Sequence, residues 1–247
     1  MLPIGDEDNA PPGFPVVNIL LIAICVAVFL YQLVSPDFTN GFSAVPAEIT
    51  TGRDLVGQFP ITLPDGSVAL VDEARGPSPI WLTLLSSMFM HGGWTHLGGN
   101  MLFLFIFGDN VERAVGHLRY LGFYLLCGLV ASLAQVYSGP DSILPSLGAS
   151  GAIAGVLAAY LVLFPRNRVR VLIGYFVTSV PAILMIGLWA VIQFVNGFGA
   201  TGVNAQSGGV AYMAHIGGFI AGLVLAFLLR PFADRTVGPH QVGFARG

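Results

Sequence analysis

The sequence predicts an all-α membrane protein folded as a bundle of six transmembrane helices. Three observations support this fold class. Only 9% of the 247 residues are charged, compared with about 25% in a typical soluble domain. Hydrophobic residues make up 55% of the chain, and the mean hydropathy is +0.78. The apolar residues are also gathered into runs long enough to cross a bilayer. A soluble protein could not cover its surface with so few charges, and a disordered chain would contain fewer apolar residues.

Length and apolarity together define the six predicted spans. The apolar stretch 81–107 is too long for one upright helix and contains Gly92 and Gly93, so we expect an interfacial segment up to about Met90 before the second span. Pro181 predicts a kink within the fifth span. The six spans are predicted at 16–34, about 94–107, 121–137, 150–164, 171–195 and 210–229.

One membrane domain is expected at residues 16–230, flanked by tails at 1–15 and 231–247. A long loop at about 35–80 joins its first two spans. Eight of the ten basic residues, all of them Arg, fall on the side of the membrane that both termini share. The positive-inside rule places that side in the cytoplasm and the 35–80 loop outside. The net charge of −3 is too small and too scattered to predict a nucleic-acid partner.

Polar side chains inside the predicted spans mark candidate functional positions, because each is costly in hydrocarbon. His96 and Asn100 lie four residues apart and so share one face of the second span. His215 lies near the outer end of the sixth span, and Ser150 begins the fourth. None of the spans contains Asp, Glu, Lys or Arg away from its ends. That absence argues against carboxylate proton relays and against a two-aspartate intramembrane protease.

Ser150 and His215 are expected at a similar depth. The fourth span makes about 22 Å of helix, whereas the hydrocarbon core is about 30 Å thick. If the cytoplasmic end is anchored by Arg166, Ser150 stops roughly 8 Å short of the outer face, and His215 lies roughly 8 Å down as well. This depth requires a water-filled depression that opens outward.

Small-xxx-small glycine faces on the fourth and sixth spans allow the two helices to approach closely. If these faces meet, the Ser150 hydroxyl and the His215 imidazole come within hydrogen-bond reach. That is the nucleophile and general-base arrangement of a serine hydrolase, without a carboxylate as third member. The glycines concerned are Gly151, Gly155, Gly218 and Gly222.

Each of these features also has a purely structural explanation. Glycine pairs pack helices, a serine at a helix start caps it, and an intramembrane histidine can hydrogen-bond to a neighbouring helix. His91, His96 and His215 could together bind a metal, but the His-Glu-x-x-His pattern is absent and no carboxylate is near. We therefore predict no metal and no other cofactor, and His91 is expected to be structural or interfacial. The combination of Ser150 and His215 at one depth favours the hydrolase.

Four segments resemble the rhomboid intramembrane serine proteases. Residues 148–151 read G-A-S-G and resemble the G-x-S-G nucleophile motif of that family. Residues 214–222 resemble its A-H-x-x-G-x-x-x-G histidine helix, and 90–100 its pattern of two histidines and an asparagine. The sequence G-D-N-V-E at 108–112 resembles the segment that follows. The resemblance extends over residues 81–229.

The resemblance implies a rhomboid-like six-helix bundle whose Ser-His dyad cleaves peptide bonds in or near the transmembrane segments of single-span or polytopic substrates. Ser150 would be the nucleophile, and His215 the general base and then the acid. The side chains of Asn100 and His96, with the Ser150 backbone N–H, would bind the oxyanion. Gly148 would leave room for the substrate backbone. We expect a multi-pass protein of the bacterial inner membrane whose active site opens to the outer side of the bilayer.

The fifth span of the family is described as a lateral gate, for which Phe176, Trp189 and Phe194 are candidates. Two departures from the family are visible. A Trp-Arg pair common in the first loop is absent, which leaves the structure of this loop open. Some members also carry an aromatic residue under the histidine, at the position of Ala154, so another residue must orient His215.

Two other classes of function remain open. One is a catalytically inactive relative that binds membrane helices, against which the intact Ser150 and His215 argue. The other is a small-molecule channel or transporter that uses the histidines. A transporter needs polar faces along a complete path, whereas the polar residues here cluster in the outer half of the membrane.

Overall fold

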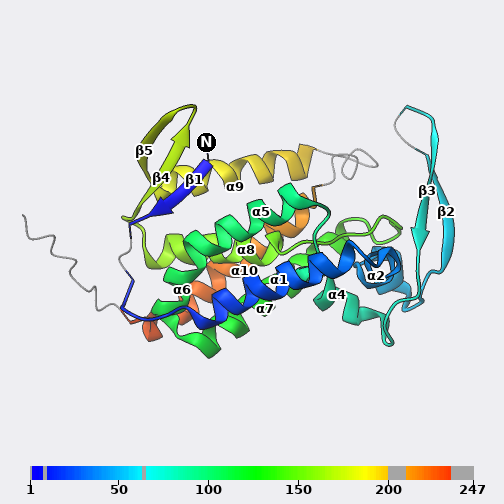
Figure 1. Ribbon diagram of the computed structural model, residues 1–247, viewed down its shortest axis with the longest axis horizontal. Coiled ribbons are helices and arrows are strands. Elements are labelled where there is room, and N and C mark those ends of the chain that lie inside the picture. The colour runs from blue at the N-terminus through cyan, green and yellow to red at the C-terminus, as the bar shows by residue number, and fades with distance from the viewer. Residues whose placement is uncertain (1, 8–9, 63–64, 200–209, 235–247) are drawn as a thin grey trace, which may run out of the picture.

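The computed structural model describes residues 2–7, 10–62, 65–199 and 210–234 (Figure 1). It is mostly helical, and the long helices run roughly side by side along the longest axis of the molecule. The principal helices are α1 (Val16–Gln32), α5 (Trp94–Phe103), α6 (Asp109–Val115), α7 (His117–Ser138), α8 (Ser150–Leu163), α9 (Ala182–Gly199) and α10 (Tyr212–Leu229). Shorter helices are α2 (Pro36–Phe42), α3 (Pro46–Thr51) and α4 (Thr83–Ser86), with 3₁₀ turns at Ile80–Leu82, Ser87–Phe89 and Arg230–Phe232.

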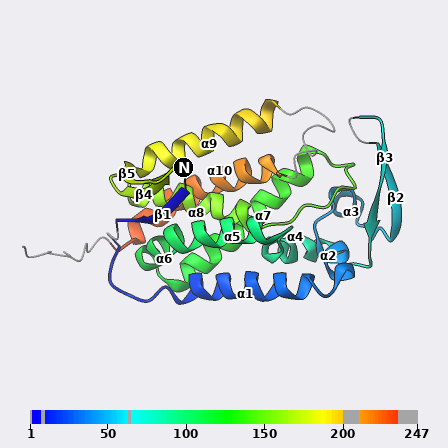
Figure 2. The ribbon, with the colours of Figure 1, turned by 45° about the horizontal axis from the view of Figure 1, so that its top comes forward.

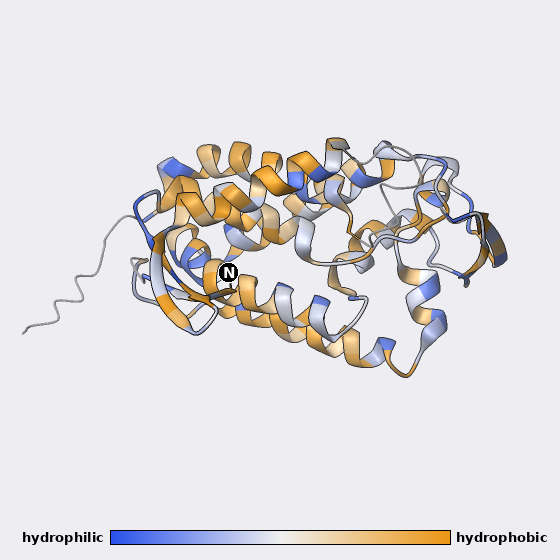
Figure 3. Cartoon of the chain, turned by 90° about the horizontal axis from the view of Figure 1, so that it is seen from above, coloured by the Kyte–Doolittle hydropathy of each residue, from blue (hydrophilic) through white to orange (hydrophobic). Residues whose placement is uncertain are grey.

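Two helices in the described part of the chain are long and apolar enough to cross a membrane, His117–Ser138 and Tyr212–Phe232. Shorter apolar helices occupy Val16–Gln32, Ile80–Phe89, Ser150–Leu163 and Ala182–Phe198. Apolar residues dominate the middle of the bundle, and many polar residues lie toward its two ends (Figure 3). The first, third, fourth and sixth predicted spans therefore coincide with helices. Of the predicted C-terminal tail, 235–247 lies outside the described residues.

The predicted fifth span is wrong in its first half. Residues Arg168–Ile173 form strand β4 and Phe176–Pro181 form strand β5, an antiparallel hairpin in which Ile173 pairs with Phe176. Gly174 in the turn has a φ of +60°, a conformation that glycine adopts without steric cost. A short apolar run rich in β-branched residues is compatible with helix or strand, and its periodicity alone does not decide between them. Pro181 does not kink a helix here, because it ends β5 immediately before α9.

The N-terminal segment completes a sheet in the order β1-β4-β5. Strand β1 (Leu2–Asp6) pairs antiparallel with β4. The Asp6 carboxylate accepts hydrogen bonds from the Tyr160 hydroxyl and, at 2.7 Å, from the Asn110 amide. The predicted tail at 1–15 is thus partly a strand bound to the ends of α6 and α8. Because the fold also contains this sheet and a separate hairpin, the all-α class needs correction: the protein is mostly helical with two small sheets.

A π-helical turn, Leu104–Gly108, joins α5 to α6 and is held by α1. The Leu104 carbonyl at the start of this turn accepts a hydrogen bond from the Asn18 amide at 3.0 Å. Tyr120 of α7 in turn donates to Asn18 at 2.7 Å. The buried Glu112 carboxylate accepts the N–H groups of Val17 and Asn18, at 2.9 and 2.6 Å. Glu112 thereby caps the first turn of α1, where negative charge stabilises the helix.

Helices α8 and α10 lie next to each other (Figure 2), and their backbones are in direct contact. A Cβ at Gly218 would overlap the carbonyl oxygen of Gly151, and a Cβ at Gly222 would overlap the backbone of Gly155. The two predicted glycine faces therefore meet. This contact fixes the start of α8 against the first turns of α10, which is where the candidate site lies.

The 35–80 loop is folded, with α2 and α3 followed by a hairpin of β2 (Gly57–Thr62) and β3 (Val68–Glu73). It buries two carboxyl groups. Glu73 is 4% exposed, and neither of its oxygens has a hydrogen-bond partner among the described residues. Burial, with Glu48 and Asp72 nearby, raises the pKa of Glu73 to about 8. Burial also raises the pKa of Glu48 to about 7, although its carboxylate accepts the Leu55 N–H.

The stability of this loop is expected to fall as the pH rises. A glutamate in the unfolded chain ionises near its ordinary pKa of 4.5, whereas folded Glu73 keeps its proton up to about pH 8. Between these values the folded state binds more protons than the unfolded state, so the free energy of unfolding decreases with pH. Glu73→Gln should remove the part of the dependence that Glu73 contributes, with Glu48 retaining the rest. Asp72→Asn removes only the smallest of the causes that raise the Glu73 pKa and should change the dependence far less. The measurement is the rate of proteolysis in the β2–β3 hairpin from acidic to alkaline pH. If this rate depended on pH as steeply in Glu73→Gln as in wild type, Glu73 would not cause the dependence.

Candidate active site

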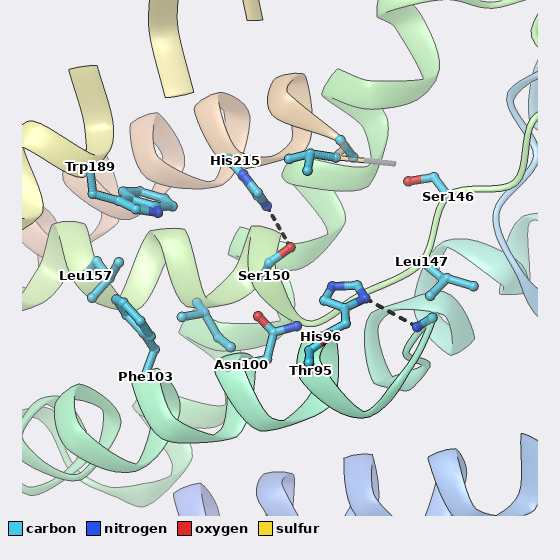
Figure 4. A pocket seen from close by; sticks show the side chains of 15 residues that line it. Thr95, His96, Asn100, Phe103, Ser146, Leu147, Ser150, Leu157, Trp189 and His215 are labelled. Carbon is cyan, nitrogen blue, oxygen red and sulfur yellow. Dashed lines mark hydrogen bonds between the residues drawn. The ribbon is translucent and has the colours of Figure 1, made fainter. Parts of the chain in front are cut away.

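Ser150 and His215 form a hydrogen-bonded pair between α8 and α10. The distance from the Ser150 Oγ to the His215 Nε2 is 2.7 Å (Figure 4). Ser150 is the first residue of α8, and His215 lies in the first turn of α10. Because the glycines bring the two helix backbones into contact, the side chains of Ser150 and His215 can reach each other. The structure therefore brings together the two residues that the sequence predicts to be nucleophile and base.

The second imidazole nitrogen of His215 contacts α9. Its Nδ1 lies 2.7 Å from the Oε1 of Gln193, a side chain that is 8% exposed. The Trp189 ring lies against the imidazole on the same helix face, with ring centroids 5.8 Å apart. Ala154 is fully buried and offers no aromatic ring. Sequence reasoning missed Gln193, and the signal that could have found it is a glutamine within an apolar span, four residues from a tryptophan.

His96 projects from α5 into the same cavity, in a defined tautomer. The backbone N–H of Gly92 donates to its Nδ1 at 3.2 Å. Because Nδ1 accepts a hydrogen bond, the neutral ring carries its proton on Nε2 and can donate from that atom. A Cβ at Gly148 would lie 3.0 Å from this Nε2. Gly148 has a φ of +138°, so both the backbone conformation and the space beside His96 require glycine.

Asn100 lies one helical turn after His96 on α5 and points into the cavity (Figure 4). Its side chain is 9% exposed, and its Nδ2 has no hydrogen-bond partner among the described residues. A buried amide N–H₂ without a partner is costly and needs an explanation, and one explanation is a catalytic role. Two donors, the His96 Nε2 and the Asn100 Nδ2, are thus available on the side of the cavity that faces Ser150.

The cavity has a volume of about 730 Å³ and lies between α5, α8, α9 and α10. Ser150, His215, His96 and Asn100 supply polar groups to it, together with the hydroxyl groups of Thr95 and Ser146. Apolar side chains form the remaining wall, as in most binding sites for organic groups. The apolar wall includes Phe103, Leu157 and Trp189, which are labelled in Figure 4. The cavity can therefore admit an apolar chain beside a hydroxyl nucleophile.

Other candidate residues lie outside this arrangement. His91 is 2% exposed, its ring packs edge-on against His96, and its backbone N–H donates to Gln32 at 2.9 Å. Phe176 begins β5 and is exposed, so it does not belong to the predicted gate helix. Phe194 lies in α9 and stacks on Phe198. Among the described residues, no group of three His, Cys, Asp or Glu side chains is arranged to hold a metal ion.

Comparison with known proteins identifies the family. The family model for the rhomboid domain matches residues 79–232. Rhomboid protease GluP of Bacillus subtilis is 36% identical over 149 residues, which are 60% of this chain and 26% of that protein. Rhomboid protease AarA of Providencia stuartii is 31% identical over 174 residues, covering 63% and 59%. Mitochondrial Rhomboid protein 1 of Saccharomyces cerevisiae is 30% identical over 158 residues, covering 62% and 43%.

The matched segments span less than two thirds of each of these relatives. The match to the family model covers more than half of this chain and contains the four motifs described above. The resemblance drawn from those motifs is therefore confirmed, and the chain belongs to the rhomboid family of integral membrane proteins.

Proposed function

We propose that this chain is an intramembrane serine protease that cleaves peptide bonds in or near the transmembrane segments of other membrane proteins. The observation that carries the proposal is the 2.7 Å contact between the Ser150 Oγ and the His215 Nε2 inside a cavity with two further N–H donors. These donors, the Asn100 Nδ2 and the His96 Nε2, have no hydrogen-bond partner among the described residues. Relatives named as rhomboid proteases support the same reaction class. No metal or cofactor is needed for this chemistry.

Each group in the cavity has a defined task in this reaction. The Ser150 Oγ attacks the scissile carbonyl carbon while the His215 Nε2 takes the hydroxyl proton. Negative charge develops on the carbonyl oxygen, where the Asn100 amide, the His96 Nε2–H and the Ser150 backbone N–H donate. The C–N bond then breaks, and His215 returns the proton to the leaving amine. Water, deprotonated by the same imidazole, hydrolyses the acyl-enzyme and frees Ser150.

The membrane arrangement we propose has six spans. They are α1, the α5–α6 segment with its π turn, α7, α8, α9 and α10. Helix α8 is short because it begins at Ser150, below the membrane surface, where the cavity admits water. Both termini then lie in the cytoplasm. Relatives come from bacteria, mitochondria and chloroplasts, so the bacterial inner membrane stays a prediction from this sequence alone.

Cysteine labelling tests the orientation. Ser67→Cys in the β2–β3 hairpin should react with an impermeant maleimide in intact cells, because the positive-inside rule places this loop outside. Tyr175→Cys, in the fully exposed β4–β5 turn at the opposite end of the molecule, should react only after the membrane is opened (Figure 1). Wild type is the control, since Cys25 and Cys127 are both buried. The reverse pattern would place the cavity on the cytoplasmic side.

The activity itself is tested with a fluorophosphonate probe and a single-span substrate in liposomes. Ser150 should be labelled covalently, and the substrate should be cut within or near its span. If the purified protein neither labels at Ser150 nor cleaves any membrane substrate, it is an inactive helix-binding relative or a transporter.

A further inference from the structure

The hydrogen bond between His215 and Gln193 determines which nitrogen of the imidazole carries the proton. The atom of Gln193 that faces Nδ1 is the amide oxygen Oε1, which can only accept. Nδ1 must therefore be protonated, which leaves the Nε2 lone pair free to accept the Ser150 hydroxyl. This is the tautomer that a general base toward Ser150 requires.

Helix α9 supplies two contacts to the imidazole. Trp189 and Gln193 are one turn apart on the face of α9 that packs on α10. The Trp189 ring also lies 6.2 Å from that of Phe219, one turn further along α10 than His215. The tryptophan is thus held between α9 and α10 beside the imidazole, while Gln193 fixes the rotation of the ring about its own axis.

The described surroundings of His215 contain no carboxylate that could take the place of Gln193. The titratable side chains that line the cavity are His215 itself and His96 of α5. The lining residues of α8, α9 and α10 add no charged group, and Ser150 is their one hydroxyl. The neutral amide is accordingly the third member of a hydrogen-bonded chain, Ser150–His215–Gln193, which crosses from α8 through α10 to α9.

We propose that Gln193 is a positioning residue that holds His215 in the tautomer and orientation needed to deprotonate Ser150. The inference rests on the proposed protease function. Because Gln193 and His215 lie on different helices, the base is oriented only where α9 packs against α10. Gln193 of α9 would thereby orient His215, the task that Ala154 cannot perform because it lacks an aromatic ring.

The test compares Gln193→Leu with Gln193→Glu in the full-length protein in liposomes. Fluorophosphonate labelling of Ser150 is the main readout, because attack on phosphorus needs the hydroxyl proton to pass to His215 as fluoride leaves. Gln193→Leu should label about 10-fold more slowly, since a buried hydrogen bond to the base is lost. Gln193→Glu keeps an acceptor and should restore the rate. Its negative charge should also move the acidic limb of the pH–rate profile to higher pH, by favouring the protonated imidazole.

Gln135→Leu is the matched control. Gln135 is also a buried glutamine, 8% exposed, and its Oε1 accepts the backbone N–H of Ala214, the residue next to His215. Its loss should lower the melting temperature and leave the pH–rate profile in place. If Gln193→Leu labels at the wild-type rate, or Gln193→Glu keeps the wild-type profile, Gln193 does not position the base. A wild-type protein that is not labelled at any pH would instead overturn the proposed function.

Discussion

Replacing Ser150 with Ala is expected to reduce cleavage of a transmembrane substrate to background while the protein stays folded. The side chain of Ser150 makes its hydrogen bond to His215 alone among the described contacts, and Ala fits the space that Ser occupies. Without the hydroxyl no acyl-enzyme forms, and loss of the nucleophile costs roughly six orders of magnitude in kcat in a serine protease. Turnover and melting temperature are to be measured on one preparation.

His215→Ala should be as damaging, and it should also abolish labelling by the fluorophosphonate, since the hydroxyl is no longer activated. His117→Ala is a control of the same residue type. His117 is half exposed at the start of α7, where its Nδ1 contacts Glu112, outside the cavity. That variant should cleave at the wild-type rate. Near-normal turnover in either Ser150→Ala or His215→Ala would remove the dyad from the mechanism.

Much of the site could be predicted because its positions are constrained by depth and by small residues. The sequence predicts Ser150 and His215 as polar residues at matching depths, each beside a glycine face, and a close helix crossing then leaves few places for their side chains. The structure has this crossing at Gly151–Gly218. His96 and Asn100 were predictable as a pair, since four residues make one helical turn.

Other features depend on contacts that no local pattern records. Gln193 matters because α9 places it against α10, and its spacing in the sequence does not indicate that neighbour. The apolar pattern of residues 171–180 predicts a helix, because both strands of the hairpin are apolar. They are strands because Gly174 turns the chain and β1, more than 160 residues earlier, supplies the hydrogen-bonding partner of β4.

The donors around Ser150 are expected to carry much of the rate. Asn100→Ala should lower turnover by roughly 100-fold, toward the lower end of the 100- to 1,000-fold range for one oxyanion-hole donor, about 3 to 4 kcal/mol. The lower end applies because two donors remain, the His96 Nε2–H and the Ser150 backbone N–H. In the structure the Asn100 Nδ2 has no partner among the described residues, which is what a donor awaiting a substrate oxygen requires. The dyad contact is untouched, so Ser150 should still label, slowly, with the fluorophosphonate.

A structural role for Asn100 predicts a different result, in which thermal stability and activity fall together. Asn110 provides the matched comparison, because it is a fully buried asparagine whose Nδ2 donates to Asp6 at 2.7 Å, far from the cavity. Asn110→Ala should lower the melting temperature and keep turnover per folded molecule. Asn100→Ala should instead keep the melting temperature and lower turnover, because the Asn100 Nδ2 has no hydrogen-bond partner among the described residues and its truncation removes none from the folded state. Full activity per folded molecule in Asn100→Ala would exclude the oxyanion role and leave His96 as the side-chain donor.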